Sequence, residues 1–190
     1  MTVPDAQRSE ETAAVRESTP AVTGRTPRRA LGTALAVAGV ALALDQGTKA
    51  LAVAHLQQGD RVPLVGDLLS LTLIYNPGAA FSLGSGTTWV FAVVGVLAAA
   101  ATVVLAARLR GARWGIALGL LLGGAVGNLV DRLVNPPSFG QGHVTDFIAY
   151  GGLFVGNVAD VFVVVSVGLL CVLLLATGQH TGMRSNEREG

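Results

Sequence analysis

The chain has 190 residues, of which 51% are hydrophobic and 13% are charged. A water-soluble domain of this size cannot bury that much apolar surface in one core, so the composition predicts an integral membrane protein. The formal net charge of +1, without a basic stripe or interleaved aromatic residues, excludes a nucleic-acid-binding surface. Cys171 is the only cysteine, which excludes a disulfide framework and a thiolate metal site.

The distribution of apolar residues along the chain predicts two tails and four spans. Residues 1–26 are rich in Glu, Arg, Ser, Thr and Pro, which is typical of a disordered tail, and residues 178–190 form a second polar tail. The membrane domain is expected to cover residues 27–177. Four apolar runs within it are long enough to cross a bilayer, at about residues 30–54, 88–109, 114–133 and 154–176. The predicted fold class is an all-α membrane protein with four transmembrane helices.

Arginine positions predict the orientation of these spans. Arginines cluster before the first run and between the second and third runs, at Arg25, Arg28, Arg29, Arg108, Arg110 and Arg113. The other two connections contain only Arg61 and Arg132. Because positively charged loops stay in the cytoplasm, both tails are predicted to be cytoplasmic and both longer connections to lie outside.

The connection between the first two spans has a β-strand pattern. Residues 69–73 alternate strictly between apolar and polar, and turn-forming residues flank them on both sides. We expect a short strand or hairpin at the outer membrane surface. Gly84, Ser85 and Gly86 are expected to hinge the chain into the second helix. The stretch at residues 135–142 holds two prolines and two glycines and is expected to be irregular.

The third apolar run carries a glycine at every fourth position. The stripe consists of Gly115, Gly119, Gly123 and Gly127. Residues at this spacing share one helix face, and small residues on such a face let a neighbouring helix approach closely. The pattern therefore predicts a tight helix–helix contact.

Two acidic residues, Asp146 and Asp160, lie near the start of the last apolar run, and no lysine or arginine adjoins either one in sequence. An ionised carboxylate at membrane depth is costly unless it is paired, hydrated or used. Two such groups in a low-dielectric pocket share one proton near neutral pH. The ionised member can activate a water molecule for attack on an amide carbonyl, so the pair predicts peptide hydrolysis.

Helix geometry places further polar residues at the same depth. With a rise of about 1.5 Å per residue, Asp45 and Asn128 each lie roughly 21 Å from the cytoplasmic end of their helices. Asp160, counted inward from residue 154, lies roughly 9 Å below the outer face of a core about 30 Å thick, which is the same level. Three helices are therefore expected to bring polar groups together.

Structural interpretations compete with the functional ones for several of these residues. Asp45 and Lys49 are spaced i, i+4 and can form a purely structural ion pair. Asp131 and Arg132 can serve as an anchor or cap at the membrane interface. Asn128 and Asn157 can simply be hydrogen-bonding contacts between helices.

Other chemistries and functions are less well supported by the sequence. His143 is the only histidine near the acids, and a helical histidine pair for zinc is absent. A Ser138–His143 nucleophile pair lacks the Gly-x-Ser-x-Gly setting. A proton-coupled transporter would show an internal repeat, which is not found between the two halves. A non-catalytic scaffold leaves the unpaired acids unexplained.

Five blocks of residues resemble the bacterial lipoprotein signal peptidase (signal peptidase II) family, in the family's order. They are Asp-Gln-Gly-Thr-Lys at 45–49, Tyr-Asn-Pro-Gly-Ala-Ala-Phe-Ser at 75–82, Gly-Gly-Ala-Val-Gly-Asn-Leu-Val-Asp-Arg at 123–132, Val-Thr-Asp-Phe at 144–147 and Asn-Val-Ala-Asp at 157–160. The resemblance covers about residues 30–176. It implies that the strand-bearing connection between the first two helices, at about residues 58–86, is a small extracytoplasmic cradle on the membrane surface that clamps the substrate.

This resemblance implies an integral membrane aspartyl endopeptidase with Asp146 and Asp160 as its catalytic dyad and no cofactor or metal. The implied supporting and substrate-binding residues are Asp45, Lys49, Asn76, Gly78, Asn128, Arg132 and Asn157. The implied substrate is a prolipoprotein, cut just before its diacylglyceryl-modified cysteine. The resemblance also implies a multi-pass monomer surrounded by lipid in the bacterial cytoplasmic membrane, with its active site near the outer leaflet.

Overall fold

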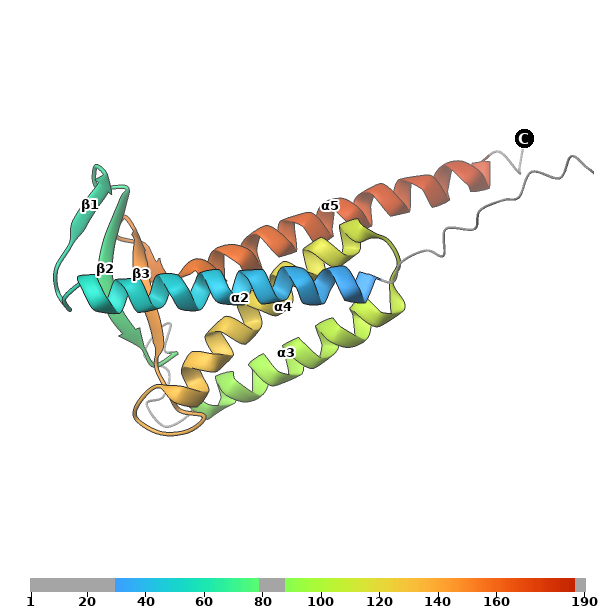
Figure 1. The fold of residues 1–190 in the computed structure, drawn as a ribbon. Helices are drawn as coiled ribbons and strands as arrows, with labels where there is room; N and C mark the ends of the chain where they lie inside the picture. Colours follow the sequence, from blue (N-terminus) through green and yellow to red (C-terminus); the bar gives the residue numbers. More distant parts are fainter. Residues whose placement is uncertain (1–29, 79–87, 187–190) are drawn as a thin grey trace, which may run out of the picture.

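The computed structural model describes residues 30–78 and 88–186, so the predicted tail at residues 1–26 and the hinge at residues 84–86 lie outside the described residues. Figure 1 shows helices at one end of the molecule joined to a small sheet at the other. The elements in chain order are α2 (Ala30–His55), β1 (Val62–Val65), β2 (Leu69–Asn76), α3 (Thr88–Arg108), α4 (Ala112–Val134), β3 (Val144–Tyr150), β4 (Phe154–Gly156) and α5 (Val158–Asn186).

The four helices of the described region are each long and apolar enough to cross a membrane, which confirms the predicted number of spans. The first three lie within two residues of their predicted ends. The fourth prediction is wrong at its start, because residues Phe154–Gly156 pair with β3 as a strand and the helix begins only at Val158. That helix also continues to Asn186, past the predicted domain limit at residue 177.

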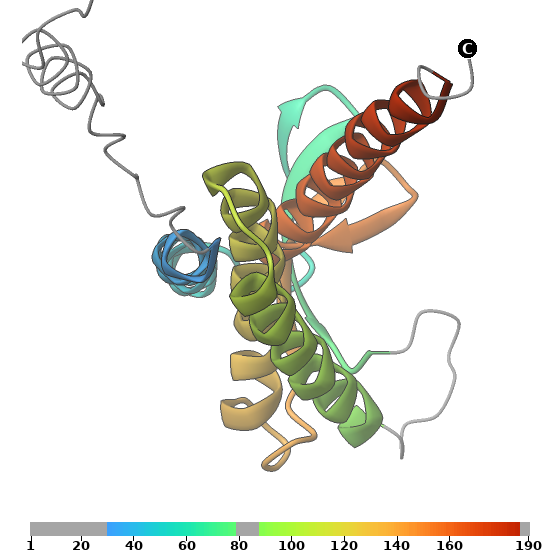
Figure 2. The same cartoon turned by 90° about the vertical axis from the view of Figure 1, so that its right-hand side faces the viewer.

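Helix α4 lies at the centre of the bundle and contacts each of the other three helices (Figure 2). The predicted glycine stripe faces α2. A Cβ atom on Gly119 would lie 2.7 Å from the carbonyl oxygen of Ala34, and one on Gly123 would lie 2.5 Å from the Cβ atom of Ala41. These spacings leave no room for a side chain, so the expected close helix contact is confirmed.

Four strands form one antiparallel sheet in the order β1-β2-β3-β4. The strand predicted at residues 69–73 is confirmed within β2. The sheet is not confined to residues 58–86, however, because β3 and β4 come from the connection between α4 and α5. Val144 pairs with Asn76, and Tyr150 pairs with Leu69. This long-range pairing places Asp146 on a strand that lies against the helix ends.

Large apolar side chains in the helices mostly point outward. Val164, Val172 and Leu175 on α5 are all more than 60% exposed, as is Leu97 on α3. The buried apolar positions of the helices are instead mostly alanines, and Ala34 and Ala106 cluster with one large residue, Leu118. A surface of this kind is suited to hydrocarbon rather than water.

Candidate active site

Asn157 connects the two aspartates singled out by the sequence. Its side-chain nitrogen donates to Asp146 Oδ1 at 2.6 Å, and its backbone N–H donates to Asp160 Oδ2 at 3.0 Å. The backbone N–H of Asp160 in turn donates to Asn157 Oδ1 at 3.1 Å. This reciprocal pair is a capping box at the start of α5, so a local sequence pattern of Asn-x-x-Asp fixes the position of Asp160.

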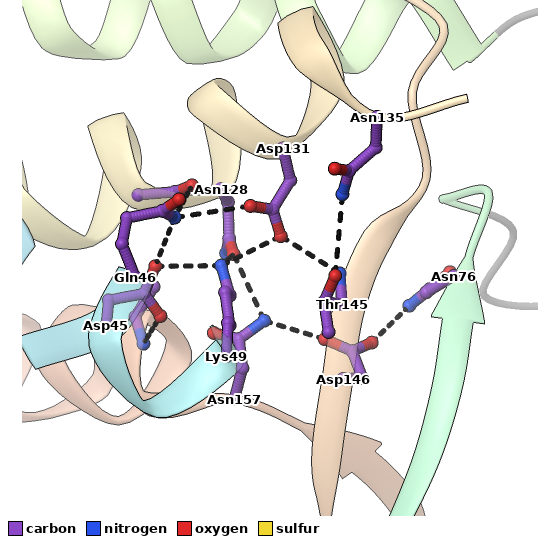
Figure 3. A network of polar contacts seen from close by, with 12 residues as sticks. Asp45, Gln46, Lys49, Asn76, Asn128, Asp131, Asn135, Thr145, Asp146 and Asn157 are labelled. Carbon is purple, nitrogen blue, oxygen red and sulfur yellow. Dashed lines mark hydrogen bonds and ion pairs between the residues drawn. The ribbon is translucent and has the colours of Figure 1, made fainter. Parts of the chain in front are cut away.

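Asn128 on α4 supports the same carboxylate from the opposite side. Its side-chain nitrogen donates to Asp160 Oδ1 at 2.8 Å. Its oxygen accepts hydrogen bonds from Lys49 Nζ and from Asn157 Nδ2, each at 3.1 Å. Figure 3 shows how Asn128 and Asn157 join the residues of α2 to those of β3. Both asparagines therefore form interhelical contacts and orient the acids at the same time.

Asn76, the last residue of β2, holds the second oxygen of Asp146. Its side-chain nitrogen donates to Asp146 Oδ2 at 2.9 Å, and its oxygen accepts the backbone N–H of Gly78 at 2.8 Å. Gly78 has a φ of 95°, a conformation that L-residues rarely adopt. The turn after β2 thus orients the amide that binds Asp146.

A buried charge cluster joins α2, α4 and β3 behind the dyad. Lys49 Nζ lies 2.8 Å from Asp45 Oδ2 and 3.0 Å from Asp131 Oδ2. Asp45 is 0% exposed and accepts the backbone N–H of Ala159 at 2.9 Å. Asp131 Oδ2 accepts the backbone N–H of Thr145 at 2.9 Å. The i, i+4 ion pair predicted for Asp45 and Lys49 is confirmed. Through Asp45 and Asp131, the cluster fixes Ala159 and Thr145, the residues that precede the two catalytic candidates.

Arg132 lies near the two aspartates and has one guanidinium N–H donor without a partner among the described residues. Its guanidinium carbon is 4.9 Å from the centre of the Phe91 ring, within the range of a cation–π contact. Among the described residues, its buried Nη1 atom has no hydrogen-bond partner. A Cβ atom on Gly78 would lie 2.7 Å from Phe91 Cδ2 and 3.1 Å from Arg132 Nη2, so the ring and the guanidinium occupy the space that a side chain would need.

The environment of Asp146 alters its acidity. Burial raises the pKa of Asp146 to about 6, and the negative charge of Asp160 acts in the same direction. The hydrogen bonds from Asn76 and Asn157 oppose this rise because they stabilise the ionised form. Asp146 therefore exchanges its proton close to neutral pH, which suits a general acid or base.

The structure brings all nine predicted site residues into one connected region. The expectation that three helices bring these polar groups together is confirmed, because Asn128 donates to Asp160 and Asp45 accepts the backbone N–H of Ala159. Asp160 lies closer to the start of its helix than predicted, because α5 begins at Val158 and Asp160 lies in its first turn.

Sequence reasoning missed Gln46 and misjudged Asp131. Gln46 Nε2 donates to Gly127 O at 3.1 Å and to Asp131 Oδ1 at 3.2 Å. Asp131 is only 3% exposed, so it is not an interfacial anchor. Asp131 lies four residues after Gly127 and three residues after Asn128. This spacing places Asp131 on the α4 face that meets α2, so the sequence contained a signal for its position.

In the part of the chain that the structure describes, His, Cys, Asp and Glu side chains form no group of three or more that could hold a metal ion. The acids are instead neutralised or oriented by asparagine amides, one lysine and backbone N–H groups.

Comparison with known proteins identifies the family. The family model described as signal peptidase (SPase) II matches residues 37–176. The chain belongs to the signal peptidase II family. The resemblance drawn from the five sequence blocks is thereby confirmed. Members of this family are proteases that remove signal peptides from prolipoproteins, and this chain is such an enzyme with four membrane-spanning helices.

Curated relatives and solved structures agree with this family. The lipoprotein signal peptidase of Leifsonia xyli is 47% identical over 152 residues, covering 78% of this chain and 70% of that protein. The lipoprotein signal peptidase of Mycobacterium avium is 46% identical over 149 residues, covering 78% of this chain and 81% of that protein. A solved bacterial membrane enzyme matches with a TM-score of 0.67 at 27% identity, covering 76% of this chain and 93% of that one.

Proposed function

We propose that Asp146 and Asp160 are the catalytic pair of this signal peptidase and cut the prolipoprotein just before its diacylglyceryl-modified cysteine. The observation that carries the proposal is their common partner. Asn157 donates its side-chain amide to one carboxylate and its backbone N–H to the other. Two acids held in this way face one reacting group from two different elements, β3 and the start of α5.

In the proposed mechanism the two acids have different protonation states. Asp146, whose pKa is raised to about 6 mainly by burial, holds the proton and donates it to the carbonyl oxygen of the scissile peptide. Asp160 accepts a proton from the attacking water. The water oxygen then bonds to the carbonyl carbon. Asp160 passes the proton that it took from water to the leaving nitrogen, and Asp146 takes back a proton from a hydroxyl of the tetrahedral intermediate. The C–N bond then breaks, which releases the amine of the lipid-modified cysteine and restores both acids to their starting states.

Neighbouring groups position the substrate in this scheme. Arg132 offers its unused Nη1 donor to a carbonyl oxygen of the substrate backbone, and the absence of a side chain at Gly78 lets the guanidinium and the Phe91 ring lie against the turn after β2. Asn76, Asn128 and Asn157 hold the carboxylates in place. Asp45 and Lys49 support them by fixing Ala159 and Asn128.

We further propose the orientation that the arginine distribution predicts. Both termini are cytoplasmic, and the sheet lies at the outer surface of the bacterial cytoplasmic membrane as a cradle for the substrate. The dyad then lies near the outer leaflet, where the lipid anchor holds the scissile bond. The enzyme acts as a monomer surrounded by lipid, and residues 27–177 contain all the catalytic parts, with residues 1–26 and 178–190 as tails.

The experiment that tests the dyad is cleavage of a lipidated prolipoprotein in liposomes by Asp146→Asn and Asp160→Asn. Each variant should lose activity by on the order of 1000-fold or more while keeping its fold, because each loses one proton-transfer group. Asp67→Asn, which changes an exposed acid in the turn between β1 and β2, is the matched control and should cleave normally. Activity within tenfold of the wild type in either dyad variant would remove that residue from the chemistry.

A further inference from the structure

An apolar groove lies between α2 and α5, on the side of Asp45 that is away from the sheet. Figures 1 and 2 show α5 diverging from α2 towards its C-terminal end. The groove has a volume of about 290 Å³, and it is lined by Leu120 of α4, Phe162 of α5 and residues of α2 between 36 and 44. All of these residues are apolar. At the rise of an α-helix, the lining of the groove covers about 12 Å along α2.

The groove and the proposed catalytic site lie on opposite flanks of α5. Ala159 and Val163 mark the α5 face that packs on α4, because a Cβ atom on Gly124 would lie 2.6 Å from Ala159 O and 2.8 Å from Val163 Cγ2. Asp160 lies about 100° around the helix from Ala159, whereas Phe162 lies about 60° from it in the other direction. The groove is therefore separate from the cleft that contains the two carboxylates.

An exposed arginine lies beyond the end of the groove that is farther from the sheet. Arg113 precedes Leu120 by seven residues, or two helical turns, so the two residues share one face of α4 and lie about 10 Å apart along its axis. The acidic residues that the structure describes all lie at the level of Asp45 or closer to the sheet. Within the described residues, the ion pairs involve only Lys49, so the charge of Arg113 is not neutralised there.

We infer that this groove holds one acyl chain of an anionic phospholipid whose phosphate binds Arg113. The apolar lining accepts hydrocarbon, and a guanidinium donates two parallel hydrogen bonds to phosphate oxygens. Basic residues beside a gap between spanning helices are typical of sites for anionic headgroups. The positive charge favours a phospholipid over the lipid anchor of the substrate, because a diacylglyceryl group is uncharged. In the proposed orientation, that anchor also lies in the opposite leaflet from Arg113.

A lipid in this groove supports the part of α5 that diverges from α2. The same helix carries Asp160 in its first turn, so the lipid stabilises the element that presents one of the proposed catalytic carboxylates. A ligand that binds only the folded protein raises its unfolding temperature. Phosphatidylglycerol should therefore raise the Tm of the enzyme in detergent.

The test is native mass spectrometry of the full-length enzyme in detergent, titrated with phosphatidylglycerol or with phosphatidylcholine of the same acyl chains. The wild type should retain one phosphatidylglycerol and bind it more tightly than phosphatidylcholine. Ala36→Trp should abolish this retention, because the indole fills the groove. Leu35→Trp is the matched control and should bind as the wild type does, since Leu35 is 53% exposed at the same depth but does not line the groove.

A second set of variants tests the charge and keeps the test valid if Ala36→Trp does not fold. Arg113→Gln should weaken phosphatidylglycerol binding by about fivefold, and Arg113→Lys should retain it. Arg108→Gln is the control, because it removes a charge at the end of α3, which does not line the groove.

Equal affinity of the wild type for the two lipids, or unchanged binding in Ala36→Trp or Arg113→Gln, would overturn the inference. Displacement of the bound lipid by added prolipoprotein would also overturn it, because the groove would then belong to the signal segment of the substrate. The measurement requires no cleavage, so its result is independent of the assignment of the dyad.

Discussion

Asn157 holds the two proposed catalytic carboxylates in place. It caps α5 and at the same time donates to Asp146, so its side-chain amide connects the start of α5 to the middle of β3. Because the side chain is 0% exposed, its amide has no access to water as an alternative partner. Its orientation is therefore fixed by the Asp146 carboxylate, by the backbone N–H of Asp160 and by Asn128.

The acidity of Asp146 leads to a prediction for pH dependence. If Asp146 donates the proton, kcat/KM should fall as pH rises through its pKa of about 6. The Asn76 hydrogen bond lowers that pKa, so Asn76→Ala should raise it and move the alkaline decline to higher pH. Asn135→Ala is the control, because Asn135 binds His143 O and Thr145 Oγ1 rather than Asp146. A shift of the decline to lower pH in Asn76→Ala would contradict the assigned role.

At this scale the sequence identified the acids and their amide partners but not all of their contacts. Asp45 and Lys49 were found because their i, i+4 spacing is a property of one helix. Gln46 was missed because its partners, Gly127 O and Asp131, are on a different helix. Contacts of this kind depend on how α2 rotates against α4, and no local pattern contains that information.

At the scale of elements, the glycine face of α4 brings α2 close enough for Asp45 to reach the active site. A Cβ atom on Gly127 would lie 2.5 Å from Asp45 Oδ2, so the acid occupies the space that a side chain would need. The adjoining face of α4, which meets α5, is similarly tight, since a Cβ atom on Gly124 would lie 2.6 Å from Ala159 O. The glycines therefore position both α2 and α5.

This packing predicts the effect of adding one methyl group. Gly119→Ala should destabilise the protein by about 1–3 kcal/mol, because the added atom would overlap Ala34 O and the side chain of Val37. Gly39→Ala on α2 is the matched control, since a Cβ atom there meets nothing within 4 Å. The control should be neutral or slightly stabilising because alanine favours helix more than glycine does. Thermal unfolding in detergent measures both, and equal Tm values for the two variants would refute the packing argument.

The helices were predictable and half of the sheet was not. Each apolar run indicates a span by its own length, and the alternation at residues 69–73 indicates a strand within a single segment. Strand β3 is buried along most of its length, so its sequence lacks that alternation. It becomes a strand by pairing with β2, which lies about 70 residues earlier in the chain. Residues Phe154–Gly156 were assigned to a helix for the same reason.

At the scale of the whole molecule, the proposed orientation places the sheet outside the cell membrane. In a Cys171→Ser background, Asp60→Cys should react with a membrane-impermeant maleimide added to intact cells, because residue 60 lies in the exposed outer connection. Ala112→Cys, at the start of α4, should react only after the membrane is permeabilised. The opposite labelling pattern would show that the sheet lies on the cytoplasmic side of the membrane. The dyad would then not lie near the outer leaflet.

The central claim is that Asp146 and Asp160 act as one catalytic unit, and cleavage of a lipidated prolipoprotein by the double variant tests it most directly. Residues that act together are strongly non-additive, so Asp146→Asn/Asp160→Asn should be no slower than either single variant, each reduced by on the order of 1000-fold. Stepwise losses that multiply in the double variant would instead show that the two carboxylates act independently, contrary to the account.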